Sequence, residues 1–213
     1  PTPPLNPTVP DGFQLVYGDI LMPTDVVEGR SVYNNKPWPN GVVPYVFAAN
    51  VNDTKRNQMR AAMRAWEAEA GVRFVQRTQE TDFIEIAELG GNFSMVGRMG
   101  GKQPLSIYNW DYKYIIMHEL AHALGIWHEQ SRSDRDTYVR IVWDNIHPAF
   151  KNNFDIEPGT SVGPYDFESI MHYPDWAFTI NGKKTIVARP GYEQYQSKMG
   201  NISRLTTLDR SEE

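Results

Sequence analysis

Cysteine is absent from the 213-residue chain, which excludes disulfide bridges and thiolate chemistry. Long apolar runs are absent too, since no stretch approaches the roughly 18 residues that mark a membrane-spanning helix. Positive charge is not in excess, because 21 basic residues face 26 acidic ones. This balance disfavours a polyanion-binding surface. We therefore expect a globular protein that neither spans a membrane nor binds nucleic acid.

Histidine is scarce as well, with five in the chain, yet three of the five follow one another closely. Four residues of an α-helix advance about 400°, so His118 and His122 lie on one face and can bind the same metal ion. Glu119 can reach a water on that metal, as a general base does. On a continuous helix His128 would point away. Gly125 resolves this, because glycine readily takes positive φ, ends the helix and returns His128 to the metal.

Hydrophobic periodicity predicts two helices and several short strands. The first helix starts at Asp53 or Thr54 as the cap, ends at Gly71 and buries one face. That face consists of Met59, Ala62, Met63 and Trp66. The second helix covers 111–124. Strands are expected over 41–47, 72–77, 82–88, 94–98 and 104–109, and Pro44 indicates that the first lies at a sheet edge or begins there.

Beyond Gly125 the turn-rich sequence predicts irregular chain, with short strands or helical turns near 138–150. The expected class is α+β: a lobe of sheet and helices up to about residue 125, then a looser lobe, with a cleft between them beside the histidines. The first twelve residues hold five prolines and predict an extended arm. Three Asn-x-Ser/Thr sequons begin at Asn52, Asn92 and Asn201, but about one or two arise by chance in such a chain.

The histidine region resembles the astacin family of metzincin zinc endopeptidases. HELAHALGIWHEQSRSDRD (118–136) matches the family signature HExxHxxGxxHExxRxDRD at every fixed position, and SIMHY (169–173) matches its Met-turn. Weaker similarity runs through WPNGVVPYVF, SMVGRMGG and TYVRIVWDNI, so the resemblance covers roughly 38–210. It implies a metzincin-type two-lobe zinc peptidase with a twisted mixed sheet and two long helices in the N-terminal lobe.

The resemblance also implies a role for each matching residue. One zinc ion is bound by His118, His122 and His128, and Glu119 is the catalytic base and proton shuttle. Tyr173 corresponds to a tyrosine that ligates zinc in the resting enzyme and then swings to the oxyanion. Three matching residues support the site structurally: Gly125, Met171, which forms an apolar floor beneath the metal, and Glu129, which contacts the buried N-terminus of the mature chain.

The segment VYGDI (16–20) contains Gly-Asp, a common turn pair whose plain interpretation is a loop. Precursors of the astacin family carry the motif F-x-G-D, whose aspartate ligates zinc in place of water. Val16 replaces the phenylalanine here, whereas Gly18 and Asp19 match. The resemblance therefore implies that residues 1–30 are an inhibitory propeptide with Gly18 and Asp19 as its switch. Residues 31–213 would be the catalytic domain, divided near 125 and 126.

Activation then requires cleavage within Val26–Ser31, either at a bond that makes Gly29 the new terminus or after Arg30. The cut would come from another protease or from the enzyme itself. The resemblance implies a secreted enzyme, expected to be a monomer, whose protein or peptide substrates dock in extended form near Ser94–Arg98. Secreted animal members typically carry disulfides, so the lack of cysteine is a departure that suggests a microbial or divergent branch.

A second class of function fits part of the pattern: a catalytically inactive metal-binding or adhesive protein that reuses the fold. Such a protein would keep the histidines but would need neither Glu119 nor Tyr173. The remaining charged and histidine residues of the region are expected to be structural. They are the ion-pairing Arg132, Asp134, Arg135 and Asp136, and the two histidines His147 and His172.

Overall fold

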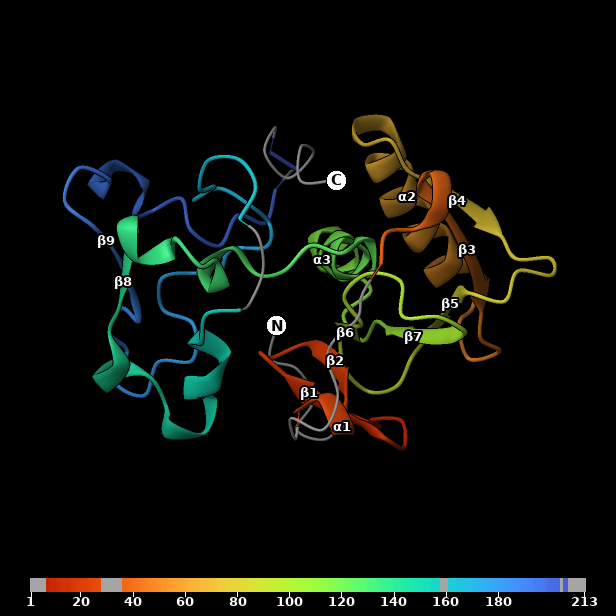
Figure 1. Cartoon of the computed structure of the whole chain (residues 1–213), viewed down its shortest axis with the longest axis horizontal. Helices are drawn as coiled ribbons and strands as arrows, with labels where there is room; N and C mark the ends of the chain where they lie inside the picture. The colour runs from red at the N-terminus through yellow and green to blue at the C-terminus, as the bar shows by residue number, and fades with distance from the viewer. Residues whose placement is uncertain (1–6, 28–35, 158–160, 204, 207–213) are drawn as a thin grey trace. The chain divides into compact units, whose positions relative to one another are not determined.

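The computed structural model of the chain describes residues 7–27, 36–157, 161–203 and 205–206. The chain divides into two compact units, one up to Ile126 and the other from Trp127 to Glu212. In the first unit a seven-stranded sheet has the order β1-β2-β6-β7-β5-β3-β4 (Figure 1). No helix in the described parts of the chain is long and apolar enough to cross a membrane.

In its described residues the first unit contains seven strands and three helices in addition to one short 3-10 turn at Pro39–Gly41. In chain order they are β1 (Phe13–Val16), β2 (Ile20–Pro23), α1 (Thr24–Val27), β3 (Val42–Phe47), α2 (Asp53–Glu69), β4 (Arg73–Gln76), β5 (Phe83–Ala87), β6 (Phe93–Ser94), β7 (Lys102–Ser106) and α3 (Lys113–Leu124). The β1–β2 and β6–β7 pairs are antiparallel and the other pairs are parallel, so the sheet is mixed, as expected.

Two local predictions need correction. Pro44 does not lie on an edge strand, because β3 pairs with both β4 and β5. It is tolerated because the ladder to β5 begins only at Tyr45, so Pro44 lies at the open end of that ladder. The cap of α2 is Asn52 rather than Asp53 or Thr54, since the Asn52 side chain accepts the N–H of Lys55 at 3.0 Å.

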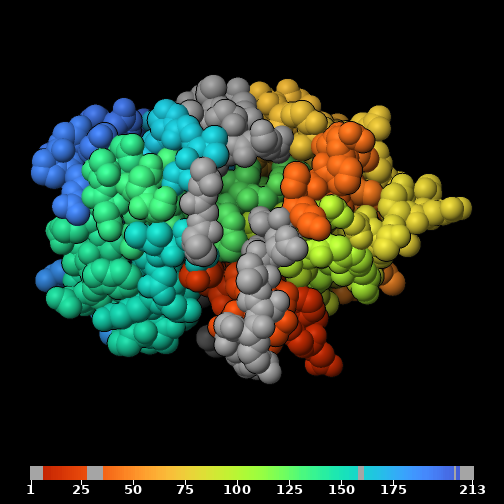
Figure 2. Space-filling model, viewed as in Figure 1, coloured from red at the N-terminus to blue at the C-terminus, as the bar shows by residue number. Residues whose placement is uncertain are grey.

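Residues 13–23 form a β-hairpin, whereas the plain interpretation of the Gly-Asp pair was a loop. Tyr17 and Gly18 turn the chain with φ of 50° and 93°, and β2 joins the sheet where Ile20 pairs with Ser94. Leu21 is fully buried in a cluster with Phe93. Figure 2 shows these N-terminal residues, in red, against the yellow-green residues of the same unit. The hairpin is therefore an integral part of the sheet.

The second unit is largely irregular, as the sequence predicts. The two strands among its described residues, β8 (Val139–Ile141) and β9 (Ile186–Ala188), pair antiparallel. The other regular pieces are 3-10 turns at Glu129–Ser131, Arg135–Thr137, Trp143–Asn145, Pro148–Phe154 and Glu193–Tyr195. Because backbone pairing is sparse, an apolar core rich in aromatic side chains holds this unit together; it includes Phe154, Phe167 and Tyr173.

Two buried tryptophans hold α3 in place. Trp66 of α2 donates its indole N–H to the carbonyl oxygen of Met117 at 3.0 Å, and Trp38 donates to that of Ala123 at 2.8 Å. The N–H of Gly97 donates to the carbonyl of His122 at 2.8 Å. These bonds lie next to both histidine positions of the helix, so they fix where the imidazoles point.

Replacing Trp66 with Phe removes one of these bonds and leaves a small void. We expect the free energy of unfolding to fall by about 1–3 kcal/mol, measured by urea denaturation. Trp176→Phe is the control, because Trp176 is 61% exposed and its replacement should change stability by less than about 0.5 kcal/mol. Equal effects of the two substitutions would contradict the anchoring role of Trp66.

Candidate metal centre

The α3 helix ends as the sequence predicts. Gly125 has φ of 115° and donates its N–H to the carbonyls of Ala121 and His122, at 3.1 and 2.9 Å. Ile126 donates to Ala121 at 3.0 Å, which completes a Schellman motif. The helix therefore stops one turn after His122.

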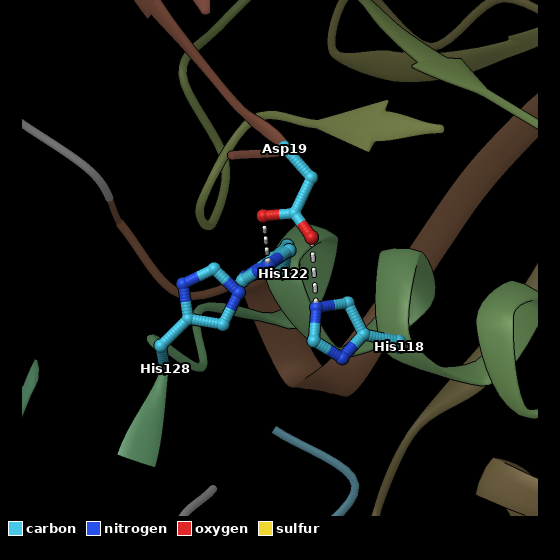
Figure 3. A group of neighbouring side chains, drawn as sticks. All are labelled: Asp19, His118, His122 and His128. Carbon is cyan, nitrogen blue, oxygen red and sulfur yellow. Dashed lines mark ion pairs between the residues drawn. The ribbon is translucent and has the colours of Figure 1, made fainter. Parts of the chain in front are cut away.

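The hairpin carboxylate faces the helix histidines. Asp19 Oδ2 lies 3.2 Å from Nε2 of His118, and Asp19 Oδ1 lies 3.5 Å from Nε2 of His122 (Figure 3). One nitrogen of each of His118, His122 and His128 and one oxygen of Asp19 lie within 4.8 Å of one another. The predicted ligands of the latent form are thus brought together.

The donor set fits a zinc ion, because imidazole nitrogen and carboxylate oxygen are ordinary zinc ligands. Nδ1 of His122 lies 2.8 Å from the carbonyl oxygen of Ile126, which can only accept a hydrogen bond. Nδ1 therefore carries the proton, and Nε2 keeps its lone pair for a metal. The backbone turn at Gly125 therefore also determines which ring nitrogen of His122 carries the proton.

Glu119 lies one residue after His118 and is 1% exposed. Burial raises the pKa of its carboxyl well above the usual range, and the negative charge of Asp19 raises it further. Its Oε2 atom is buried and, among the residues that the structure describes, has no hydrogen-bond partner. Such a carboxyl can accept a proton and hold it, as a general base must.

In the second unit the Met-turn is tied to the segment that follows His128. The N–H of Glu129 donates to the carbonyl of Met171, and the N–H of Tyr173 donates to Oε1 of Gln130, both at 3.1 Å. The rings of His128 and Tyr173 lie 4.7 Å apart. Sequence reasoning missed Gln130, because no local pattern indicates a contact with a residue so distant in the chain.

Glu129 is buried, with 3% of its surface exposed. Its Oε1 accepts the N–H of Asp166 at 2.7 Å and lies 3.4 Å from Nη1 of Arg132. Arg132 also pairs with Asp134 at 2.9 Å, and Arg135 lies 3.4 Å from Asp136. The expected ion pairs therefore form, and Arg132 joins one of them to the buried Glu129 carboxylate.

The remaining two histidines make structural hydrogen bonds. His172 donates from Nδ1 to its neighbour's carbonyl at 2.7 Å and accepts the hydroxyl of Tyr165 at 2.8 Å. Burial lowers the pKa of His172 to about 4, so its ring is neutral at physiological pH. His147 accepts the N–H of Ala149 at 3.2 Å.

Comparison with known proteins agrees with this geometry. The model of the astacin family of peptidases matches residues 30–212. The chain belongs to the astacin family. His118, His122 and His128 are the zinc-binding triad of this family.

High choriolytic enzyme 2 of Oryzias latipes is 43% identical over 185 residues, which cover 83% of this chain and 66% of that protein. High choriolytic enzyme 1 of the same fish is 42% identical over 185 residues, covering 83% and 68%. The astacin-like metalloendopeptidase of Mus musculus is 37% identical over 192 residues, covering 86% and 44%. The matched region thus spans about two thirds or less of these relatives.

Among solved structures, the hatching enzyme zinc-protease HCE-1 of medaka aligns with a TM-score of 0.76 and 41% identity, covering 83% of this chain and 90% of that one. This likeness confirms the expected α+β fold. Myroilysin aligns with a TM-score of 0.51 and 21% identity over 82% of each chain, and it supports the fold alone.

Gly125→Ala tests the turn that directs His128. A side chain at φ of 115° is strained by at least about 1–2 kcal/mol, so we expect zinc affinity to fall about tenfold or more in competition with a chelator. Gly101→Ala is the matched control, because Gly101 has φ of 68° and open space for a Cβ atom. Parental affinity in the Gly125 variant would contradict the role of the turn.

Proposed function

We propose that this chain is the latent precursor of a zinc-dependent endopeptidase that hydrolyses internal peptide bonds of proteins. The observation that carries the proposal is the Asp19 carboxylate facing Nε2 of both helix histidines. Residues 1–30 would be the inhibitory segment and 31–213 the catalytic domain, with lobes at about 31–125 and 126–213. The family match to 30–212 supports this division.

His118, His122 and His128 would hold the zinc ion, which supplies a Lewis acid and lowers the pKa of water towards about 7. Glu119 takes the proton of the attacking water and passes it to the leaving nitrogen. The phenol of Tyr173 donates a hydrogen bond to the oxyanion that develops on the scissile carbonyl. The burial of Glu119 beside His118 and the bond that holds the Tyr173 backbone support these roles.

Latency follows from two effects of the segment that precedes the catalytic domain. The Asp19 carboxylate takes the ligand position that substrate or water needs. The carbonyl of Asp19 accepts the N–H of Ser94 at 3.1 Å, and the next residue, Ile20 of β2, pairs with Ser94. Both contacts fall on Ser94, at one end of the edge Ser94–Arg98 at which we expect substrate to dock. The chain thus blocks its own substrate edge.

Activation requires removal of the inhibitory segment, residues 1–30. The cleavable stretch Val26–Ser31 lies mostly outside the described residues, so the choice between Gly29 as the new terminus and cleavage after Arg30 stays open. Either another protease or the enzyme itself would make the cut. Buried Glu129 would then bind the new N-terminal ammonium group, for which a desolvated carboxylate is suited. Family members are typically secreted, and we propose the same for this chain, acting as a monomer.

The alternative is a metal-binding or adhesive protein without catalysis. It would need no proton acceptor beside the metal ligands, yet Glu119 is buried next to His118. A casein assay before and after limited trypsin treatment separates the two functions. Activity should appear only after treatment if the chain is a zymogen, and not at all if it only binds metal.

Glu119→Gln tests the assigned base. After removal of the arm, we expect kcat/KM for casein to fall by a factor of about 10²–10⁴ with unchanged zinc content. A chelator should abolish the parental activity. Glu85→Gln is the control, because Glu85 forms a surface ion pair with Lys102 and should be dispensable. Full activity in the Glu119 variant would show that another group accepts the proton.

Asp19→Ala tests latency. We expect the precursor to gain basal activity or to mature spontaneously, measured by casein cleavage and by the intact mass of the chain. Asp11→Ala, which changes an exposed aspartate of the same arm, should stay latent. Adding Glu119→Gln to Asp19→Ala should stop maturation if the enzyme cleaves itself. Unchanged latency in the Asp19 variant would remove this carboxylate from the mechanism.

A further inference from the structure

The three Asn-x-Ser/Thr sequons differ in what their amides do in the folded chain. A chain that carries an N-glycan reaches its fold only if the modified asparagine lies at the surface and its Nδ2 can carry a sugar with the fold intact. The sequence cannot rank the three sites, since all have the required hydroxyl residue two positions later. Their hydrogen bonds do rank them.

The amide of Asn92 joins two chain segments. Its Oδ1 accepts the backbone N–H groups of Tyr108 and Asn109, at 2.8 and 3.0 Å. Its Nδ2 donates to Oδ1 of Asn109 at 2.7 Å. Both ends of this half-buried amide are therefore engaged between the start of β6 and the chain that follows β7. A sugar on Nδ2 would have to displace that chain.

The amide of Asn201 is also engaged at both ends. Its Nδ2 donates to the carbonyl of Glu168 at 2.7 Å. Its Oδ1 accepts the N–H and the hydroxyl of Ser203, at 2.9 and 2.7 Å. Ser203 is the hydroxyl residue of the same sequon, so the folded turn engages both polar side chains of this sequon.

Asn52 uses only one end of its amide. Its Oδ1 caps α2 by accepting the N–H of Lys55 at 3.0 Å, and the residue is exposed together with Asp53 and Thr54. Within the described ranges no hydrogen bond involves Nδ2 of Asn52. A sugar on Nδ2 leaves Oδ1 in place, so the helix cap survives the modification.

We infer that Asn52 is the N-glycan acceptor of this protein and that Asn92 and Asn201 are not modified in the native chain. The donor would be an oligosaccharide linked to a lipid through a diphosphate. Nδ2 forms the bond to C1 of the first sugar while the C1–oxygen bond to the diphosphate breaks. The lipid diphosphate leaves, and the amide nitrogen loses one proton.

The inference rests on the proposed secretion, because the donor and its transferase lie on the secretory route of eukaryotic cells. Transfer precedes folding, so the structure decides which modified chains can reach the native state. A sugar on Asn92 or Asn201 would have to fit beside an Nδ2 that already donates to a neighbouring chain segment, whereas a sugar on Asn52 meets no such bond among the described residues.

The test is to secrete the full chain from a eukaryotic host behind a leader peptide supplied by that host. The purified product is treated with a peptide N-glycosidase in heavy-oxygen water, which hydrolyses the glycosylated amide and leaves an aspartate that carries one labelled oxygen, and the peptides are read by mass spectrometry. We expect the isotope label on the Asn52 peptide and none on the peptides of Asn92 and Asn201. Because no protease assay enters this reading, it is independent of whether the chain is an enzyme.

Variants of the sequon separate the glycan from the helix cap. The Thr54→Ala variant should carry no glycan and so show no shift in gel mobility, while Asn52 still caps α2. The Thr54→Ser variant should keep the glycan and the cap. An unmodified Asn52 in the secreted chain, or a glycan on Asn92 or Asn201 of the native product, would overturn the inference. If secretion fails, translation into microsomes with protease protection identifies chains that entered the lumen, and an unmodified Asn52 there overturns it equally.

Discussion

The α3 helix has to stop one turn after its second histidine, because a longer helix would carry the third ligand away from the first two. Gly125 supplies the stop by taking a φ of 115°, which side-chain-bearing residues rarely adopt. The same turn places the carbonyl of Ile126 against Nδ1 of His122 and so sets the proton on that ring. One backbone conformation therefore governs both the direction of the chain and the chemistry of a ligand.

The second determinant is the way in which the arm is held. A carboxylate on a loose tail would reach the histidines only part of the time, because ordering a free chain costs entropy. Here Asp19 immediately precedes β2, whose Leu21 is buried in the core of the sheet. The carbonyl of Asp19 accepts a hydrogen bond from the N–H of Ser94. The sheet thus offsets the entropy cost of ordering Asp19, which would keep the proposed block in place until the connecting chain is cut.

The sequence was most informative where rare residues recur at fixed spacing. The three histidines, Gly125 and the buried face of α2 all follow from helical geometry. The β1–β2 hairpin did not, because its strands are only four residues long and β2 joins the sheet through a single residue pair with β6. The contact between Gln130 and Tyr173 was equally hidden, since it joins residues 43 positions apart with no local signal.

The most direct measurement is anomalous diffraction at the zinc edge from crystals of the full chain grown with zinc. We expect one zinc ion bound by a nitrogen of each of His118, His122 and His128 at about 2.0–2.1 Å, with an oxygen of Asp19 as the fourth ligand. A pocket that takes up no zinc, or a zinc ion bound without all three imidazoles or without Asp19, would contradict it.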